Sequence, residues 1–110
     1  MGPKISSFAI DRDAMRSHVG EAAKLLKALA NEKRLIILCL LAEGERSVSE
    51  INEMVDLSQS ALSQHLALLR REKLVQTRRD AQSVYYSLVP GSALDVIETL
   101  HQIYCGTDRA

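Results

Sequence analysis

The stretch from residue 47 to residue 73 constrains the fold of this 110-residue chain most, because its pattern fits two short helices joined by a tight turn. Ser47 is followed three residues later by Glu50, which is the spacing of a capping box at the start of a helix. The turn falls at residues 56–57, and Ser58 is placed to cap the second helix. This arrangement predicts a helix-turn-helix.

The second helix of this motif has an outer face that suits DNA. Turning the helix by about 100° per residue separates its leucines from a side of small hydroxyls, amides and arginines, with Arg70 at the flank and no acid before Glu72. Glutamine can pair with an adenine edge, and arginine with guanine or phosphate. The plainer alternative is a solvated polar face that lacks carboxylates. The residues predicted to contact DNA are Gln59, Ser60, Ser63, Gln64 and Arg71.

The charges are unevenly distributed although the formal net charge is zero. Residues 58–79 carry five basic residues and one acidic residue, whereas residues 41–57 carry one basic residue and five acidic ones. A polyanion responds to the local field more than to the net charge of the whole protein. The basic block coincides with the second helix of the motif, which is compatible with DNA binding there.

The segment from Leu74 to Leu88 alternates apolar and polar residues, which predicts a β-hairpin. Its tip contains no glycine, so a longer loop is expected rather than a two-residue turn. Arg78, Arg79 and Gln82 at such a tip suit phosphate contact or entry into the minor groove. An exposed charged loop is the alternative. Because the hairpin directly follows a helix-turn-helix, it is interpreted as a wing.

Two helices are predicted before the motif. The first should begin near Asp11 or Asp13, and the second should run from about Glu32 to Ala42 and end at Gly44. The second helix is apolar nearly all round, which is typical of a helix in the centre of a fold.

One more helix is predicted after the hairpin, starting at Pro90, with Ser92 as its cap. The apolar stripes of the first and last helices need more cover than one small domain supplies. We therefore expect a homodimer that packs these two helices across a two-fold axis, with fully intramolecular packing as the alternative.

The predicted fold class is mainly α (α+β), a winged helix-turn-helix with four helices, two strands and a final helix. One domain is expected over residues 11–110, preceded by a flexible tail at residues 1–10. The longest apolar run is the eight residues from Leu35 to Ala42, which is too short to span a membrane. The amino terminus has no extended apolar segment of the kind found in secretory signals, so a cytoplasmic protein is expected.

Residues 28–38 and 57–70 resemble the ArsR-type winged-helix repressors of bacteria, at the entry to the second helix and over the recognition helix respectively. The resemblance extends over about residues 14–105, and the second segment is the more specific. It implies a homodimer that binds an inverted-repeat operator in double-stranded DNA. The two recognition helices would then enter successive major grooves about 34 Å apart.

Departures from that family's metal-binding patterns argue against a metal sensor. Many members use a Cys-x-Cys pair where this chain has the single Cys39. Others use Asp-x-His on the last helix, but Asp95 is followed two residues later by Ile97. Glu98 and His101 are too few for a closed zinc site. We expect no metal site and no cofactor, and keep a metal- or arsenic-responsive repressor as the alternative function.

The two cysteines, Cys39 and Cys105, lie in two different predicted helices, and no local motif links them. Taken alone, they fit buried cysteines that act as small hydrophobic residues. The resemblance implies a different role, because the family's persulfide-sensing branch carries one cysteine in each of these helices, and residues 79–86 are similar to its wing. Carried over, Cys39 and Cys105 would be the redox-sensing pair, and a reactive sulfur species acting as inducer would join them through a disulfide or polysulfide bridge and release DNA. Neither site favours a thiolate, because Cys39 lies among leucines and Cys105 at a helix carboxyl end.

Other classes of function are less well supported by the sequence. The chain has no Cys-x-x-Cys, no glycine-rich phosphate loop and no nucleophile–base pair at a recognisable spacing, so no enzyme is expected. A winged helix that binds a protein is a further alternative. Its partner binding would be insensitive to salt, whereas DNA binding weakens steeply as salt rises.

Overall fold

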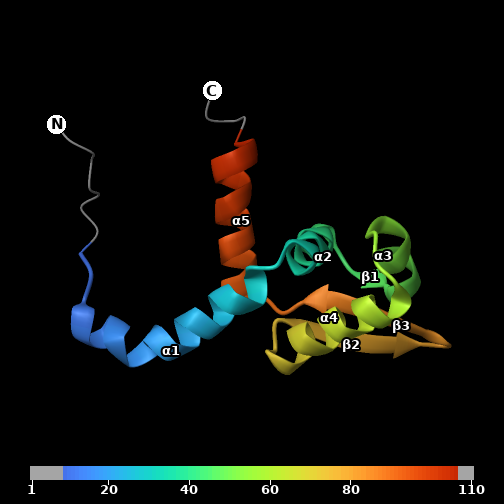
Figure 1. The fold of residues 1–110 in the computed structure, drawn as a ribbon, viewed down its shortest axis with the longest axis horizontal. Helices are drawn as coiled ribbons and strands as arrows, with labels where there is room; N and C mark the ends of the chain where they lie inside the picture. The colour runs from blue at the N-terminus through green and yellow to red at the C-terminus, as the bar shows by residue number, and fades with distance from the viewer. Residues whose placement is uncertain (1–8, 107–110) are drawn as a thin grey trace.

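The computed structural model describes residues 9–106, and over these residues the chain folds into five helices and one three-stranded antiparallel sheet (Figure 1). The elements in order are α1 (Arg12–Leu29), α2 (Glu32–Glu43), β1 (Arg46–Ser47), α3 (Val48–Met54), α4 (Gln59–Arg71), β2 (Val75–Asp80), β3 (Ser83–Leu88) and α5 (Ser92–Cys105). The predicted winged helix-turn-helix is confirmed. Residues 1–8 of the predicted flexible tail lie outside the described residues.

Side-chain caps start the first four helices. Asp11, rather than Asp13, caps α1 by accepting from the backbone N–H of Ala14 at 3.1 Å. The capping box of α3 is complete: Ser47 Oγ accepts from the Glu50 N–H at 3.1 Å, and Glu50 Oε1 accepts from the Ser47 N–H at 2.8 Å. Asn31 and Ser58 cap α2 and α4 in the same way. These caps satisfy backbone donors that a helix start leaves free, so they fix the helix boundaries locally.

The hydrophobic core is centred on α2, as its apolar sequence predicted. This helix packs against α1, α4, α5 and β3. The fully buried side chains of the core come from α2, α3 and α4, and they are Ile37, Leu38, Ile51, Leu62 and Leu69. The core therefore fixes the position of α4 through its buried leucines and leaves the opposite side of that helix to solvent.

The sheet contains a strand that the sequence did not predict. β1 pairs antiparallel with β3, with Arg46 opposite Tyr86, and the strand order is β1-β3-β2. β1 has only two residues, so it is too short to show an alternating pattern. It joins the end of α2 to the hairpin, so the wing is attached to the helical body on that side.

The prediction of a longer loop at the hairpin tip was wrong. Asp80 pairs with Ser83, which leaves only Ala81 and Gln82 between the strands. Ala81 adopts a left-handed conformation with φ of 57°, which alanine tolerates at a small energetic cost. The six paired positions of β2 and β3 offset that cost. As a consequence, Arg78 and Arg79 belong to β2 and not to the tip.

The start of α5 also differs from the prediction. The helix begins at Ser92, Gly91 occupies the N-cap position, and no side chain caps it. Pro90 lies outside the helix. The prediction failed because a serine in the first helical turn and a serine at the cap give the same local sequence signal.

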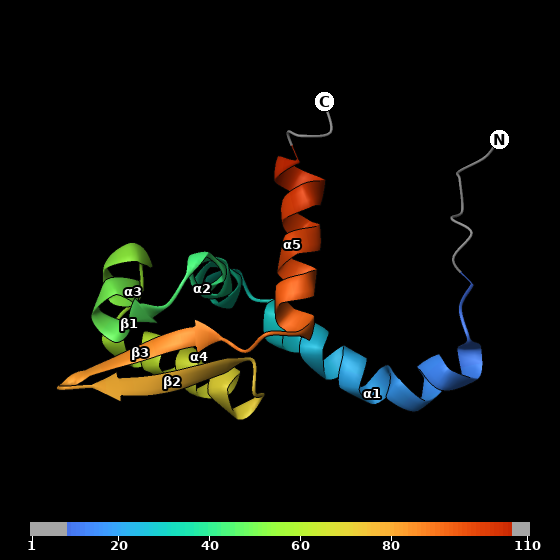
Figure 2. The same cartoon turned by 180° about the vertical axis from the view of Figure 1, so that it is seen from behind.

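Helices α1 and α5 extend away from the compact body that contains the sheet (Figures 1 and 2). Both expose large apolar side chains, which include Met15, Val19 and Leu26 on α1 and Ile103 and Tyr104 on α5. Tyr104 is 80% exposed. The single chain therefore leaves these two stripes uncovered. Within residues 9–106, none of the helices combines the length and the apolar character that crossing a bilayer requires.

Candidate nucleic-acid interface and thiol pair

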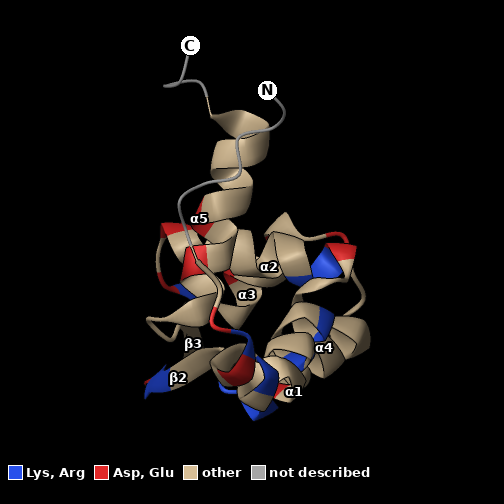
Figure 3. Cartoon of the chain, turned by 90° about the vertical axis from the view of Figure 1, so that its left-hand side faces the viewer, with Lys and Arg blue, Asp and Glu red and all other residues tan. Residues whose placement is uncertain are grey.

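The outer face of α4 carries every residue that the sequence placed there. All five predicted contact residues of this helix are exposed, namely Gln59, Ser60, Ser63, Gln64 and Arg71. The opposite face is anchored in the core by Leu62, Leu66 and Leu69. In Figure 3 basic residues colour segments of α4 and β2. This face is therefore polar, exposed and bordered by positive charge, as a DNA-reading surface requires.

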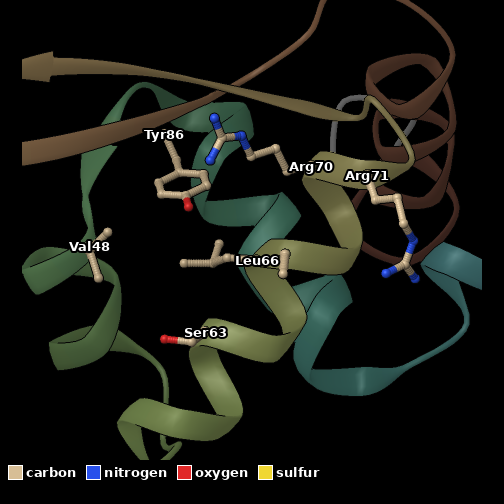
Figure 4. Close-up of a pocket in the computed structure, with 7 residues that line it drawn as sticks. Val48, Ser63, Leu66, Arg70, Arg71 and Tyr86 are labelled. Atoms are coloured by element: carbon tan, nitrogen blue, oxygen red, sulfur yellow. The ribbon is translucent and has the colours of Figure 1, made fainter.

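A hollow of about 430 Å³ separates α4 from the wing, and its lining includes Ser63, Arg70, Arg71 and Tyr86 (Figure 4). Figure 4 shows the Arg70 side chain turned toward Tyr86, whereas Arg71 extends in another direction. Arg71 Nε lies 3.9 Å from Glu72 Oε2. Arg70, which the helical periodicity placed only at the flank, thus faces the space between α4 and the wing. The sequence did not single it out, because a helical projection contains no information about the wing.

The wing places its predicted residues in two different situations. Arg79 and Gln82 are exposed at the far end of the hairpin. Arg78 instead donates two hydrogen bonds to Glu45, from Nε at 2.7 Å and from Nη2 at 2.8 Å. Its guanidinium also lies 4.5 Å from the centroid of the Tyr85 ring. The hydrogen bond from Arg78 lowers the pKa of Glu45, so this carboxylate is ionised and the wing is tied to the segment before β1.

Behind the reading face, Arg34 connects three helices. Its Nε donates to the carbonyl oxygen of Ala28 at 2.7 Å, and its Nη2 donates to that of Lys27 at 3.1 Å. Its Nη1 lies 3.5 Å from Nδ1 of His65 on α4. Burial lowers the pKa of His65, and the charge of Arg34 lowers it further. The imidazole is therefore neutral near pH 7, so Nδ1 can accept a hydrogen bond from Arg34.

The two cysteines face one groove. Cys39 from α2 and Cys105 from α5 both line a cavity of about 630 Å³ between these helices. Both are free thiols and both are exposed, so the interpretation as buried hydrophobic residues was wrong. Burial within the groove nevertheless raises the pKa of the Cys39 thiol, and Cys105 and Glu43 raise it further. The structure thus brings together two distant cysteines, and Cys39 is disfavoured as a thiolate, as expected.

Glu98 and His101 line the same groove as the thiols. Within residues 9–106, no three His, Cys, Asp or Glu side chains are grouped in a way that could hold a metal ion. The groove brings together two thiols, carboxylates and an imidazole.

Comparison with known proteins shows where this architecture occurs. Residues 31–77 match the model of the bacterial regulatory proteins of the arsR family. The transcriptional activator HlyU of Vibrio cholerae is 48% identical over 107 residues, which cover 97% of this chain and 99% of that protein. The structure of reduced HlyU from the same organism aligns with a TM-score of 0.79 and 52% identity, over 84% of this chain and 98% of that one.

Two further structures are similar over most of their length. The transcriptional repressor BigR of Xylella fastidiosa aligns with a TM-score of 0.81 and 36% identity, over 87% of this chain and 98% of that one. A homodimeric winged helix-turn-helix DNA-binding domain of Mycobacterium bovis aligns with a TM-score of 0.72 and 31% identity, over 89% of both chains. The sequence and the fold agree, and the chain belongs to the arsR family of bacterial regulatory proteins as a winged helix-turn-helix transcriptional regulator.

Proposed function

We propose that the protein is a dithiol redox-sensing repressor. The reduced homodimer binds an inverted-repeat operator, and a persulfide or another oxidant releases the DNA by bridging Cys39 and Cys105. The observation that carries this proposal is the position of the two thiols, which come from α2 and α5 and line one groove. The two helices have different surroundings. Helix α2 packs against α4, whereas α5 exposes an apolar stripe.

DNA contact is assigned to the face formed by α4 and the wing. The residues of this face are Gln59, Ser60, Ser63, Gln64, Arg71, Arg78, Arg79 and Gln82, and Arg70 is added to them. The serines and glutamines of α4 are suited to base edges in the major groove, and the arginines to phosphates. Phosphate contact by Arg78 competes with its two hydrogen bonds to Glu45.

A homodimer is supported by the uncovered stripes of α1 and α5. Apolar patches of this kind are usually covered in the working form of a protein. The Mycobacterium bovis relative is described as homodimeric, which points the same way. Two copies of α4 in a dimer could reach successive major grooves, whose centres are about 34 Å apart.

A persulfide, R–S–SH, can form the bridge without any other oxidant. One cysteine thiolate attacks the outer sulfur, so that the thiol R–SH leaves and a cysteine persulfide forms. The second thiol then attacks the inner sulfur of that persulfide, forms the disulfide and releases H₂S. The two cysteines lose two electrons, which reduce the transferred sulfur to sulfide. If both cysteines have taken up sulfur first, the same attack gives a trisulfide and H₂S.

The bridge would act on DNA binding through helix positions. A disulfide holds its α-carbons within about 7 Å, and a longer sulfur chain relaxes this limit. Tying α2 to α5 would shift the helix that supports α4 relative to the dimer surface. The usual coupling of such switches is about 1–3 kcal/mol, which corresponds to about 5- to 150-fold in affinity.

A single experiment tests this function. The reduced protein is treated separately with peroxide, a small disulfide and a persulfide, and the mass of each product is measured. Because the chain contains only two cysteines, every thiol modification falls on Cys39 or Cys105. The affinity of each product for an operator selected from random duplexes is then determined. We expect the persulfide to give a bridged product with weakened DNA binding.

The variants Cys39→Ser and Cys105→Ser provide the matched controls, since each keeps one thiol. Both should bind the operator when reduced and should keep it after persulfide treatment. Release of DNA by either single variant would refute the pair. Weakening of DNA binding by stoichiometric zinc or arsenite, with the thiols reduced, would favour the metal-responsive alternative.

A further inference from the structure

We propose that the groove between α2 and α5 binds the organic part of the inducer and selects it by charge, favouring persulfides with a positively charged group over anionic ones. The inference rests on the proposed function of Cys39 and Cys105 as the sensing pair. It adds the substrate class, a small cationic organic persulfide.

The size and walls of the groove suit a small organic group. Its volume of about 630 Å³ falls within the range of small-molecule sites. The large apolar side chains of its walls are Leu35, Leu94, Ile97 and Leu100. A short carbon chain attached to the reacting sulfur can therefore lie against apolar surface while its sulfur meets a thiol.

The polar side chains of the groove give it negative charge. Glu43 and Glu98 are the carboxylates of its lining, His101 adds an imidazole, and none of the lysines and arginines within residues 9–106 lines it. Glu43 is partly compensated, because its Oε1 accepts a hydrogen bond from Arg46 Nη2 at 3.0 Å. Among the described residues no cation lies within ion-pair distance of Glu98. Glu98 is therefore the main candidate for attracting a cationic group.

The raised pKa of the Cys39 thiol agrees with a negative electrostatic field in the groove. Burial is the largest cause of this shift, and the charges of Cys105 and Glu43 raise the pKa of the thiol further. A field that disfavours a thiolate also disfavours an anionic reagent that approaches the same place. The reaction itself is the one given above: the thiolate attacks the outer sulfur of R–S–SH, and R–SH leaves. Only the charge on R differs between favoured and disfavoured reagents.

Three persulfides of similar size test the charge preference. They are prepared from 2-aminoethanethiol, 2-mercaptoethanol and 3-mercaptopropionate, which carry a positive, a neutral and a negative group. The rate of protein modification at pH 7.5 is divided by the rate with an uncharged cysteine peptide, which removes differences in intrinsic reactivity. At low salt we expect the cationic reagent to react fastest and the anionic one slowest, with about a threefold step per unit charge. In 1 M salt, where the screening length falls to about 3 Å, the three normalised rates should converge.

A charge-neutral variant shows whether the groove is responsible. Glu98→Gln keeps the shape of the side chain and should reduce the preference for the cationic reagent. Glu53→Gln removes an exposed acid of α3 outside the groove and should leave the preference unchanged. Operator binding by each reduced variant verifies that the fold is intact.

The outcomes separate this inference from the proposed function. Equal normalised rates at low salt, or an unchanged preference in Glu98→Gln, would overturn the charge selection. If bridging and DNA release still occurred in those samples, the sensor function would stand without it. Absence of any bridged product with all three reagents would overturn both.

Discussion

Arg78 of the wing and Glu45 of the segment before β1 form a two-pronged ion pair, with N–O distances of 2.7 and 2.8 Å. The pair connects β2 to the short segment between α2 and β1, and α2 is the helix that carries Cys39. Glu45 binds the guanidinium group of Arg78 much as a DNA phosphate would, because both groups present two oxygens that accept hydrogen bonds from its parallel N–H donors. DNA contact by this arginine therefore requires Glu45 to share or release it.

Neutralising Glu45 should strengthen DNA binding. In Glu45→Gln the amide binds Arg78 less strongly than the carboxylate does, and a negative charge near the DNA is removed. We expect a higher operator affinity and a steeper salt dependence, with a change of about 0.9 in the slope of log K against log[salt] for one added phosphate contact. Fluorescence anisotropy at several salt concentrations measures both. Glu53→Gln is the control for loss of an acid elsewhere, and weaker binding by Glu45→Gln would show that Arg78 serves to hold the wing.

Replacing Arg34 by glutamine should loosen the attachment of α4 to α1 and α2. The change removes the hydrogen bonds to the carbonyl oxygens of Ala28 and Lys27 and the contact with His65. Hydrogen bonds from charged groups contribute about 1.5–3 kcal/mol, so we expect the free energy of unfolding to fall by about 2 kcal/mol. Urea denaturation measures it, with Lys33→Gln as a control for loss of a neighbouring charge. Equal stability of the two variants would contradict the role of Arg34.

The same contact makes stability depend on pH through His65. Burial and Arg34 lower the pKa of His65 below the usual value of 6.5, so the folded protein takes up this proton less readily than the unfolded chain. The contribution of neutral His65 to the free energy of unfolding is fully present above pH 6.5 and is lost as the pH falls through the lowered pKa. Urea denaturation at pH 5.5 and pH 7.5 should show a smaller difference for His65→Gln than for the natural protein. An equal difference in the two proteins would contradict the coupling between His65 and Arg34.

The sequence predicted those parts of the fold that depend on local signals. The Ser47 and Glu50 capping box and the Ser58 cap are each encoded within four residues of chain, and the structure contains both of them. β1 could not be predicted, because two residues become a strand only through pairing with distant β3.

The candidate site was predictable only in part for the same reason. The apolar character of α2 on nearly all sides concealed that Cys39 is exposed, since only the packing of α5 shows which side stays open. The direction of Arg70 likewise depends on where the wing lies. Contacts between elements, rather than the elements themselves, were missing from the sequence interpretation.

A charge on the apolar stripe of α1 should prevent dimerisation. Val19 is 51% exposed in the single chain, and Val19→Glu would place a carboxylate where the proposed interface excludes water. We expect sedimentation to show a monomer with normal helix content and at least tenfold weaker operator binding, about 1.4 kcal/mol. Ser17→Glu, on the other side of the same helix, should remain dimeric. A dimeric Val19→Glu would place the interface elsewhere.

The two neighbouring arginines at the end of α4 should contribute unequally to DNA binding. Both arginines line the hollow between α4 and the wing, but Arg70 is turned toward Tyr86, whereas Arg71 extends in another direction and lies 3.9 Å from Glu72. Arg70→Gln should therefore lower the salt slope by about 0.9, as expected for one lost phosphate contact, and Arg71→Gln should lower it less. The two variants control for one another, because each removes one positive charge from the same turn. A larger loss in Arg71→Gln would mean that DNA approaches from the other side of the helix end.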